Sequence, residues 1–236
     1  MKSKLRHLIV ATLAMLPTHS LASAAKYSAI HSIAIVSHIG NEFSFERSGM
    51  TIFDNHLDHA SLDGWALDQR FVDSLTKILS SRYVIKSEPA SSFSLDGCDS
   101  PSDCAKLLPR SADFDAYVVV YGSTSRGFGA PGQEFNGVGL FYIPGFIRSA
   151  HTALHVIYGI AVIDAKTGSV IDWTGGQLSK SYFGDHPPPV MDADGSLWPE
   201  TVPNLTTQQI DAIKASISQL LDDSIPSTVD ALGLLQ

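Results

Sequence analysis

The run Ala116-Tyr-Val-Val-Val-Tyr-Gly-Ser123, AYVVVYGS, decides what kind of fold this sequence can adopt. β-branched and aromatic residues follow one another there without a charge, which is typical of a buried strand. No other segment of the 236-residue chain is as strand-like. We therefore expect a β-sheet built around this run, with the neighbouring segments supplying its other strands and its helices.

Several other segments have the length and composition of strands. They are Ser32–Ser37 (SIAIVS), Tyr83–Lys86 (YVIK), and the two arms of a hairpin joined by a tight AKTG turn, Thr152–Asp164 and Ser169–Gly176. The alternation within Glu42–Phe53 predicts either a hairpin around Ser48-Gly49 or a long loop.

Two long helices are expected. Helical spacing begins after Asp63, which is placed as a cap, and a second helix begins at Thr206 or Thr207. A short helix with proline near its start is expected over Ser100–Leu108. The apolar faces of the two long helices are Trp65, Phe71, Val72, Leu75, Ile78 and Leu79, and Ile210, Ile213, Ile217, Leu220 and Leu221.

This order of elements predicts an α/β fold. We expect a two-layer sandwich of one mixed β-sheet with two long helices, rather than a doubly wound parallel sheet. Gly/Pro-rich loop insertions are expected at about 122–151 and 183–205, within a single domain that covers residues 25–236.

The amino terminus has the pattern of a secretory signal peptide. Three basic residues precede a short apolar segment, Leu8–Leu16, and the small residues Ala22-Ser23-Ala24 follow it. The apolar segment is too short to span a bilayer as a helix. We expect cleavage after Ala24 and a mature protein that is periplasmic or secreted.

The charge of the chain argues against nucleic acid as a partner. The formal net charge of −8 becomes −11 once the three basic residues of the expected signal peptide are removed. Phosphate binding needs clustered lysine or arginine, and the sequence has no such cluster. No second hydrophobic stretch reaches the length of a transmembrane segment, so none is expected in the mature chain.

Cys98 and Cys104, within GCDSPSDCA, are the two cysteines of the chain. In an oxidising compartment, a pair separated by a Ser-Pro turn indicates a local disulfide that fixes a loop. A redox pair or a metal site is the alternative. A redox pair usually has C-x-x-C spacing, however, and a thiolate metal site needs further ligands.

The segment GFGAPG (127–132) spells G-x-G-x-x-G, the pattern of a dinucleotide-binding loop. No helical period follows it, and Pro131 removes one of the N–H groups that would hold a pyrophosphate. The position where an acidic residue should hold the ribose has no carboxylate. We therefore interpret the segment as a glycine loop and expect no cofactor.

Candidate catalytic and metal-ligating residues are sparse. His56 and His59 in DNHLDH could begin a metal site, but no third ligand can be identified. His151 and His155 alternate on a strand and are interpreted as structural or exposed. DADG (192–195) favours a turn over a calcium loop. Carboxylates in the two loop insertions could serve a hydrolase, among them Asp185, Asp192, Asp194 and Glu200.

The strand AYVVVYGS and the hairpin Val162–Val170 resemble one family of envelope domains. They are similar to the amino-terminal domain of the Tol-system protein TolB and to the periplasmic domain of the curli-secretion lipoprotein. Asp164, Thr167 and Gly168 occupy the marked places of that family's hairpin. The resemblance implies a non-catalytic assembly or interaction module. The family's lipidation cysteine is missing here, and Gly122–Gly145 is foreign to its pattern.

The segment Gly137–Ile147, GVGLFYIPGFI, interleaves glycines with large apolar residues. It is either one more strand that contributes to the core or a contact surface for a partner. The residues expected to form that surface are Leu140, Phe141, Tyr142, Ile143 and Phe146.

Two classes of function follow from the sequence. The first is a non-catalytic, exported interaction or assembly module of the cell envelope that binds an envelope protein or associates with itself. The alternative is an exported hydrolase with carboxylate or metal-assisted chemistry in the loops.

The signal pattern generates a first prediction. The protein recovered from the periplasm or the medium should begin at Ala25, because Ala22-Ser23-Ala24 provides the small residues that signal peptidase requires. Amino-terminal sequencing of the folded protein checks this, and a retained Met1 would contradict it.

Overall fold

A computed structural model describes the protein over residues 26–49, 53, 55–86, 93–126, 134–145, 149–179, 186–199 and 204–236. The expected cleavage site after Ala24, the glycine loop GFGAPG and Phe146 lie outside the described residues. No helix within these ranges is long and apolar enough to cross a membrane.

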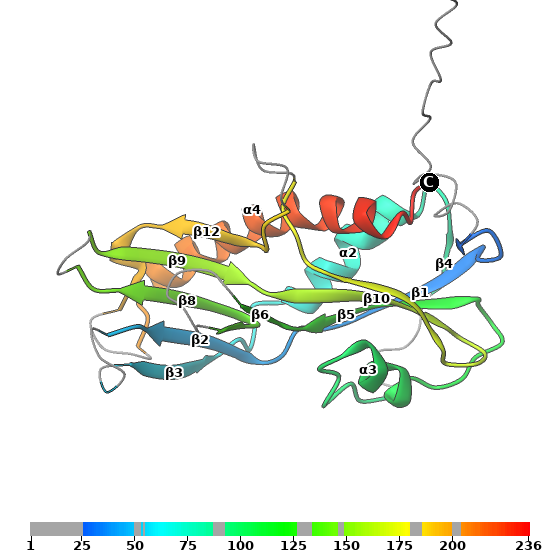
Figure 1. Ribbon diagram of the computed structural model, residues 1–236, viewed down its shortest axis with the longest axis horizontal. Helices are drawn as coiled ribbons and strands as arrows, with labels where there is room; N and C mark the ends of the chain where they lie inside the picture. Colours follow the sequence, from blue (N-terminus) through cyan, green and yellow to red (C-terminus); the bar gives the residue numbers. More distant parts are fainter. Residues whose placement is uncertain are drawn as a thin grey trace, which may run out of the picture.

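The apolar run Ala116–Gly122 forms β5, the central strand of a mixed five-stranded sheet. The order of this first sheet is β11-β10-β5-β1-β4 (Figure 1). β1 is parallel to β4 and to β5, whereas β10 is antiparallel to β5 and to β11. Its strands are β1 (Ser32–His38), β4 (Val84–Lys86), β5 (Ala116–Gly122), β10 (Tyr158–Asp164) and β11 (Val170–Gly175).

A second five-stranded sheet has the order β12-β9-β8-β2-β3. β2 is parallel to β8, and the other neighbours in this sheet are antiparallel. Its strands are β2 (Glu42–Arg47), β3 (His56–Ser61), β8 (Val138–Ile143), β9 (His151–Val156) and β12 (Val190–Ala193). The α/β class is confirmed, but two mixed sheets replace the single sheet that we expected.

The two sheets lie end to end because two strands run through both of them. β1 continues into β2, and β9 continues into β10 across the single residue Ile157 (Figure 1). Between these long strands, β5 leaves the sheet into a two-stranded hairpin, β6 (Thr124–Arg126) and β7 (Glu134–Asn136), and the chain returns as β8. The hairpin belongs to the insertion expected at about 122–151.

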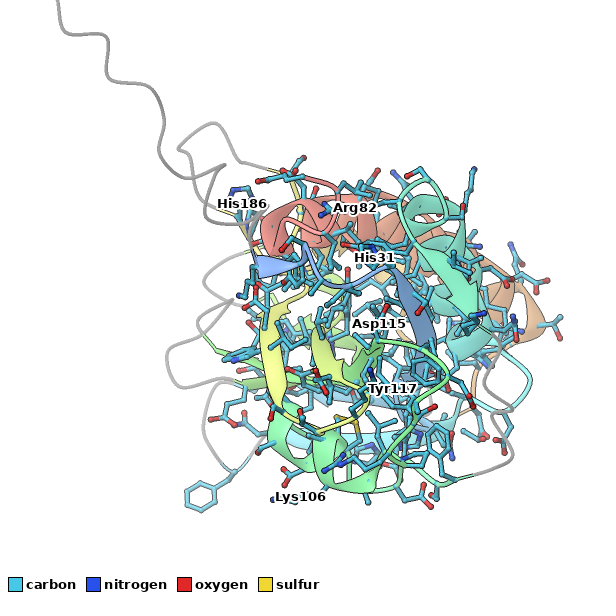
Figure 2. All side chains as sticks on the ribbon, turned by 90° about the vertical axis from the view of Figure 1, so that its right-hand side faces the viewer. His31, Arg82, Lys106, Asp115, Tyr117 and His186 are labelled. Atoms are coloured by element: carbon cyan, nitrogen blue, oxygen red, sulfur yellow. A yellow bond between two sulfur atoms is a disulfide. The ribbon has the colours of Figure 1, made fainter. Side chains whose placement is uncertain are left out.

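Helices cover both faces of the first sheet. α2 (Leu67–Leu79) and α4 (Thr207–Leu232) lie on one face and α3 (Pro101–Leu107) on the other (Figure 1). Figure 2 shows α3 with Lys106 on one side and Arg82 beside α4 on the other, with Tyr117 between them. The two long helices and the short helix α3 were all expected. The two-layer sandwich was not found, because α3 covers the opposite face of the sheet and forms a third layer.

The two covered faces explain the uninterrupted apolar run in β5. Val118 and Val120 belong to the main core with α2 and α4. Tyr117, Val119 and Tyr121 point the other way and pack in the core beneath α3. Because both faces of the strand are buried, alternation between apolar and polar residues disappears.

Helix starts follow the sequence signals at α4 but not at α2. The Thr206 hydroxyl accepts from Gln209 N, and the Gln209 side chain returns the bond, which is a complete capping box. α2 starts at Leu67 after Ala66, whose side chain cannot cap and whose φ is +54°. The expected cap at Asp63 is therefore wrong. Asp68, in the first turn, accepts from the Ser37 hydroxyl and the Ile39 N–H and so ties the helix to β1.

The hairpin expected within Glu42–Phe53 is formed by different residues. β2 pairs with β3, so that Glu42 lies opposite Ser61 and Arg47 lies opposite His56. The second arm is thus HLDHAS, which alternation did not mark because it is an edge strand with largely exposed side chains.

The predicted disulfide is confirmed. Cys98 and Cys104 are bonded, with their Cα atoms 4.5 Å apart, and both side chains are buried in the core beneath α3. The Ser100 side chain caps α3 by accepting from Asp103 N, and Pro101 occupies the first helical turn as expected. The bond therefore fixes the loop before α3 against the helix itself.

Removing the crosslink should weaken the fold without abolishing it. In the double variant Cys98→Ser/Cys104→Ser we expect the free energy of unfolding to fall by about 2–3 kcal/mol, because the closed loop is short. Chemical denaturation followed by circular dichroism measures this, with the reduced wild-type protein as control. An unchanged midpoint in both samples would contradict the prediction.

Candidate functional site

A cleft of about 510 Å³ opens where the two sheets meet. Its walls come from the turn between β1 and β2, from β2 and β3, from the disulfide loop at Cys98 and Asp99, and from the β6–β7 hairpin. The cleft lies on the face opposite the main core, because Ser44 lines it while the neighbours Phe43 and Phe45 are core residues packed toward the helices.

The alternation of β2 sets the character of this wall. In Glu42-Phe-Ser-Phe-Glu46, the two phenylalanines are buried, with their ring centroids 5.0 Å apart. Since successive side chains of a strand point to opposite faces, Glu42, Ser44 and Glu46 face the cleft. One short segment thus supplies both an aromatic layer of the core and a polar wall of the cleft.

The lining of the cleft is acidic. Among the residues that the structure describes, its lining contains four carboxylate residues and two histidines but neither lysine nor arginine. His59 Nδ1 lies 3.3 Å from Glu42 Oε2, and His38 Nε2 lies 3.8 Å from Asp96 Oδ1. The carboxylates are Glu42, Glu46, Asp99 and Glu134.

Three neighbouring strands bring together Ser44, Gly139 and His155 on the same face of the second sheet as the cleft. Their backbones are in register, with Gly139 between Ser44 on β2 and His155 on β9. A methyl group on Gly139 would overlap Ser44 Oγ and would lie 2.8 Å from His155 Nε2. The glycine therefore leaves the space in which the hydroxyl and the imidazole approach each other.

His155 is fully buried and only half satisfied. Its Nδ1 lies 3.2 Å from the carbonyl oxygen of Gly137, and the ring of Phe135 packs 5.0 Å from its own ring. Among the residues that the structure describes, Nε2 has no hydrogen-bond partner. Burial lowers the pKa of His155 to about 4, so the imidazole is neutral at neutral pH. With Nδ1–H donating to Gly137, Nε2 presents an unused lone pair.

The segment expected to form a contact surface is strand β8 together with the residues that follow it. Leu140 belongs to the main core, and Phe141 packs against Phe135 with ring centroids 5.2 Å apart. Both are buried because both faces of β8 are covered, so neither can touch a partner in this fold. Tyr142, which stacks on Trp198 at 5.1 Å, and Ile143 are half-buried.

His56 and His59 do not come together. Residues three apart on a strand point to opposite faces, and only His59 lines the cleft. Across the described ranges, no three His, Cys, Asp or Glu side chains are grouped so that they could hold a metal ion. Asp54 of the same motif lies outside these ranges.

The remaining candidate carboxylates are scattered. Asp185 and Glu200 lie outside the described residues. Asp192 Oδ1 is 3.7 Å from His151 Nε2. Asp194 accepts from Ser196 N at 2.8 Å and caps a short 3₁₀ turn, η2 (Gly195–Leu197), and these hydrogen bonds lower its pKa. The turn predicted for DADG therefore involves only its second half, because Asp192 and Ala193 belong to β12.

Ser44 and Gly139 were not singled out from the sequence, and His155 was treated as an ordinary strand histidine. The polar face of EFSFE marks Ser44 as a wall residue once β2 is known to be a strand. The pairing of β2 with β8, which in turn pairs with β9, cannot be read from local patterns, because β2 is far from these two strands along the chain.

A scan against protein-family models finds no match for this chain, and a search of curated proteins finds none either. The resemblance to the Tol-system and curli-secretion domains therefore stays a prediction.

The burial of His155 generates a prediction about acid stability. Its pKa is below 6.5 in the folded state, so the unfolded chain binds the proton more readily, and stability should fall as the pH drops from about 6.5 toward about 4. The contribution reaches about 3 kcal/mol. In His155→Gln, the loss over this range should be smaller by that amount.

Thermal and urea unfolding at several pH values between 4 and 7 measure the effect. His151→Gln is the matched control, because His151 is an exposed histidine on the same strand and its loss should leave the wild-type profile unchanged. Identical pH dependence in His155→Gln and wild type would contradict the assignment.

Proposed function

We propose that this chain is an exported, non-catalytic interaction module of the cell envelope and that the acidic cleft is its binding surface. The cleft carries the proposal, because segments far apart in the chain converge there to form a polar wall at the junction of the two sheets. Concave sites with a few convergent polar groups are the usual places for ligands.

Two observations support export. The first 24 residues have the pattern of a signal peptide. The disulfide between Cys98 and Cys104 belongs to an oxidising compartment, and Cys98 itself lies in the wall of the cleft. The proposed binding surface is thus partly fixed by a bond that forms outside the cytoplasm.

The solvation of the cleft favours binding over catalysis. The side chain of Glu42 is 71% exposed, and His59 beside it is 44% exposed. Groups that act as acids or bases in enzymes are commonly desolvated, and this desolvation shifts their pKa values. An exposed carboxylate is not desolvated. Exposed charges of one sign instead attract and orient a partner of the opposite sign.

The hairpin that carries the family resemblance supports the same class of function. Asp164 Oδ1 accepts from the backbone N–H groups of Lys166 and Thr167 and from the Thr167 hydroxyl. Gly168 has a φ of +70°, which closes the turn. The marked residues of the motif are therefore explained by turn geometry, as expected of a structural module of the Tol-system or curli-secretion type.

A pair of matched positions tests the proposal in the native host. Leu57 lines the cleft and is 57% exposed, whereas Val84 is 58% exposed on β4, an edge strand of the other sheet. With p-benzoylphenylalanine at either position, irradiation of cells should give a defined crosslinked product from position 57, either with an envelope protein or with a second copy of the chain.

The control at position 84 should give little of that product, because that edge is remote from the cleft. Gel analysis and mass spectrometry of the purified adducts provide the measurement. Equal products from both positions, or none from position 57, would overturn the cleft as the binding surface.

A further inference from the structure

We propose that the cleft recognises a primary ammonium group, with Ser44 as a hydrogen-bond acceptor in its wall and Glu42 and Asp99 as counter-charges. His155 is then a positioning residue that fixes the Ser44 hydroxyl. This inference rests on the proposed function and names the chemistry of the ligand.

The charges of the cleft select a cation. Glu42 and Asp99 stand on different walls, one on β2 and one in the disulfide loop. Among the described lining residues, His59 lies beside Glu42, and no lysine or arginine stands in the lining. A ligand that enters between the walls therefore meets negative charge from both sides. Anionic ligands are repelled by these carboxylates, and neutral ligands gain no attraction from them.

The unused lone pair of His155 points to a hydrogen-bond role for Ser44. His155 Nε2 is buried without a partner among the described residues, and it approaches the space over Gly139 that Ser44 Oγ occupies. Leaving a buried acceptor unsatisfied costs about 1–3 kcal/mol, so such groups call for an explanation. The Ser44 hydroxyl is the polar group of the cleft wall that stands beside this imidazole.

The Ser44 proton has two possible acceptors. It is donated to the carbonyl oxygen of Val138 at 3.3 Å, which is long for a hydroxyl donor. Ser44 Oγ is not in hydrogen-bond geometry with Nε2 as it stands, because Nε2 has no partner among the described residues, so a change of the Ser44 rotamer would be needed to satisfy Nε2 and replace this weak bond. Both lone pairs of Ser44 Oγ are then free to accept from a ligand, because a hydroxyl has one proton and two acceptor positions.

Once its proton is given to His155, Ser44 offers a ligand only hydrogen-bond acceptors, and the carboxylates of Glu42 and Asp99 do the same. An ammonium group offers only hydrogen-bond donors. A hydroxyl oxygen and carboxylates on separate walls can each take one of the three N–H bonds of a primary ammonium. A guanidinium fits less well, because its planar fork pairs best with a carboxylate that accepts two parallel bonds. The source of the ammonium is either a free amine or the lysine side chain of a protein partner.

Calorimetric titration of the mature protein with defined probes tests the proposal. The probes are 1,5-diaminopentane, an acetylated lysine-containing tripeptide amide, its arginine counterpart, and tetramethylammonium. We expect the diamine, the lysine peptide or both to bind, and the one that binds identifies the source. Tetramethylammonium, which carries the charge but no donor, should bind at least tenfold more weakly.

Two variants with matched controls place the site. Ser44→Ala should weaken amine binding about tenfold, and Glu42→Gln about three- to fivefold. Asp211→Asn, which removes an equal charge from the exposed face of α4, and Ser81→Ala at an exposed turn should bind as the wild type does. Equal affinity of all four variants would overturn the assignment of Ser44 and Glu42.

The role of His155 has its own readout. The ¹⁵N resonance of His155 Nε2 should shift when the amine is added to the wild type and should stay unchanged in Ser44→Ala, whose fold is checked by its melting temperature. A purely structural histidine would show no ligand-dependent shift.

Three results would overturn the proposal: no amine binding, tetramethylammonium binding as tightly as the diamine, or tighter binding of the arginine peptide. If a crosslink still forms from position 57 in any of these cases, the cleft remains the proposed binding surface. Only the proposal that it recognises an ammonium group is then overturned. Loss of both observations would remove the proposed function as well.

Discussion

Three backbone hydrogen bonds at the junction of the two sheets set the architecture of this protein. Ser123 N donates to Ile157 O, Ile157 N donates to Gly137 O, and Gly137 N donates to Ser123 O. These bonds continue the pairing at the point where β5 leaves the sheet and the β6–β7 hairpin emerges. On either side of this point, β5 lies between β1 and β10 in the first sheet, and β8 lies between β2 and β9 in the second. The cleft lies at this same point, and its shape therefore depends on the junction.

Glycine makes the junction possible at two places. A Cβ on Gly122 would lie 2.9 Å from the carbonyl oxygen of Ile39, so a side chain there would push the β1–β2 turn away. Gly137 has a φ of +54°, which other residues adopt at a cost. The backbone that bends at Gly137 also presents the carbonyl oxygen that holds His155 Nδ1. The folding of the junction and the orientation of His155 are thus parts of one local structure.

α4 spans the joint on the opposite face. Its buried residues belong to the core that is shared by both sheets. Near its carboxyl end, the Tyr158 hydroxyl lies 3.0 Å from the hydroxyls of Ser224 and Thr228, and Gln177 N donates to Thr228. This buried network satisfies its polar groups and ties β10 and the chain after β11 to the helix. α4 therefore packs against both sheets on the face of the main core. It does not cover the opposite face, where the cleft lies.

The sequence by itself determined the elements whose signals are local. These are the buried strand AYVVVYGS, the two long helices, the capping box at Thr206, the hairpin around the AKTG turn and the disulfide, because each depends on neighbours within a few residues. Tertiary structure alone decided the division into two sheets, the burial of Leu140 and Phe141, and the edge strand that carries His56 and His59. It also brought Ser44 together with Gly139 and His155, from which it is separated along the chain by about a hundred residues. Pairing of distant strands depends on shape and burial across the whole molecule, and local periodicity contains no information about it.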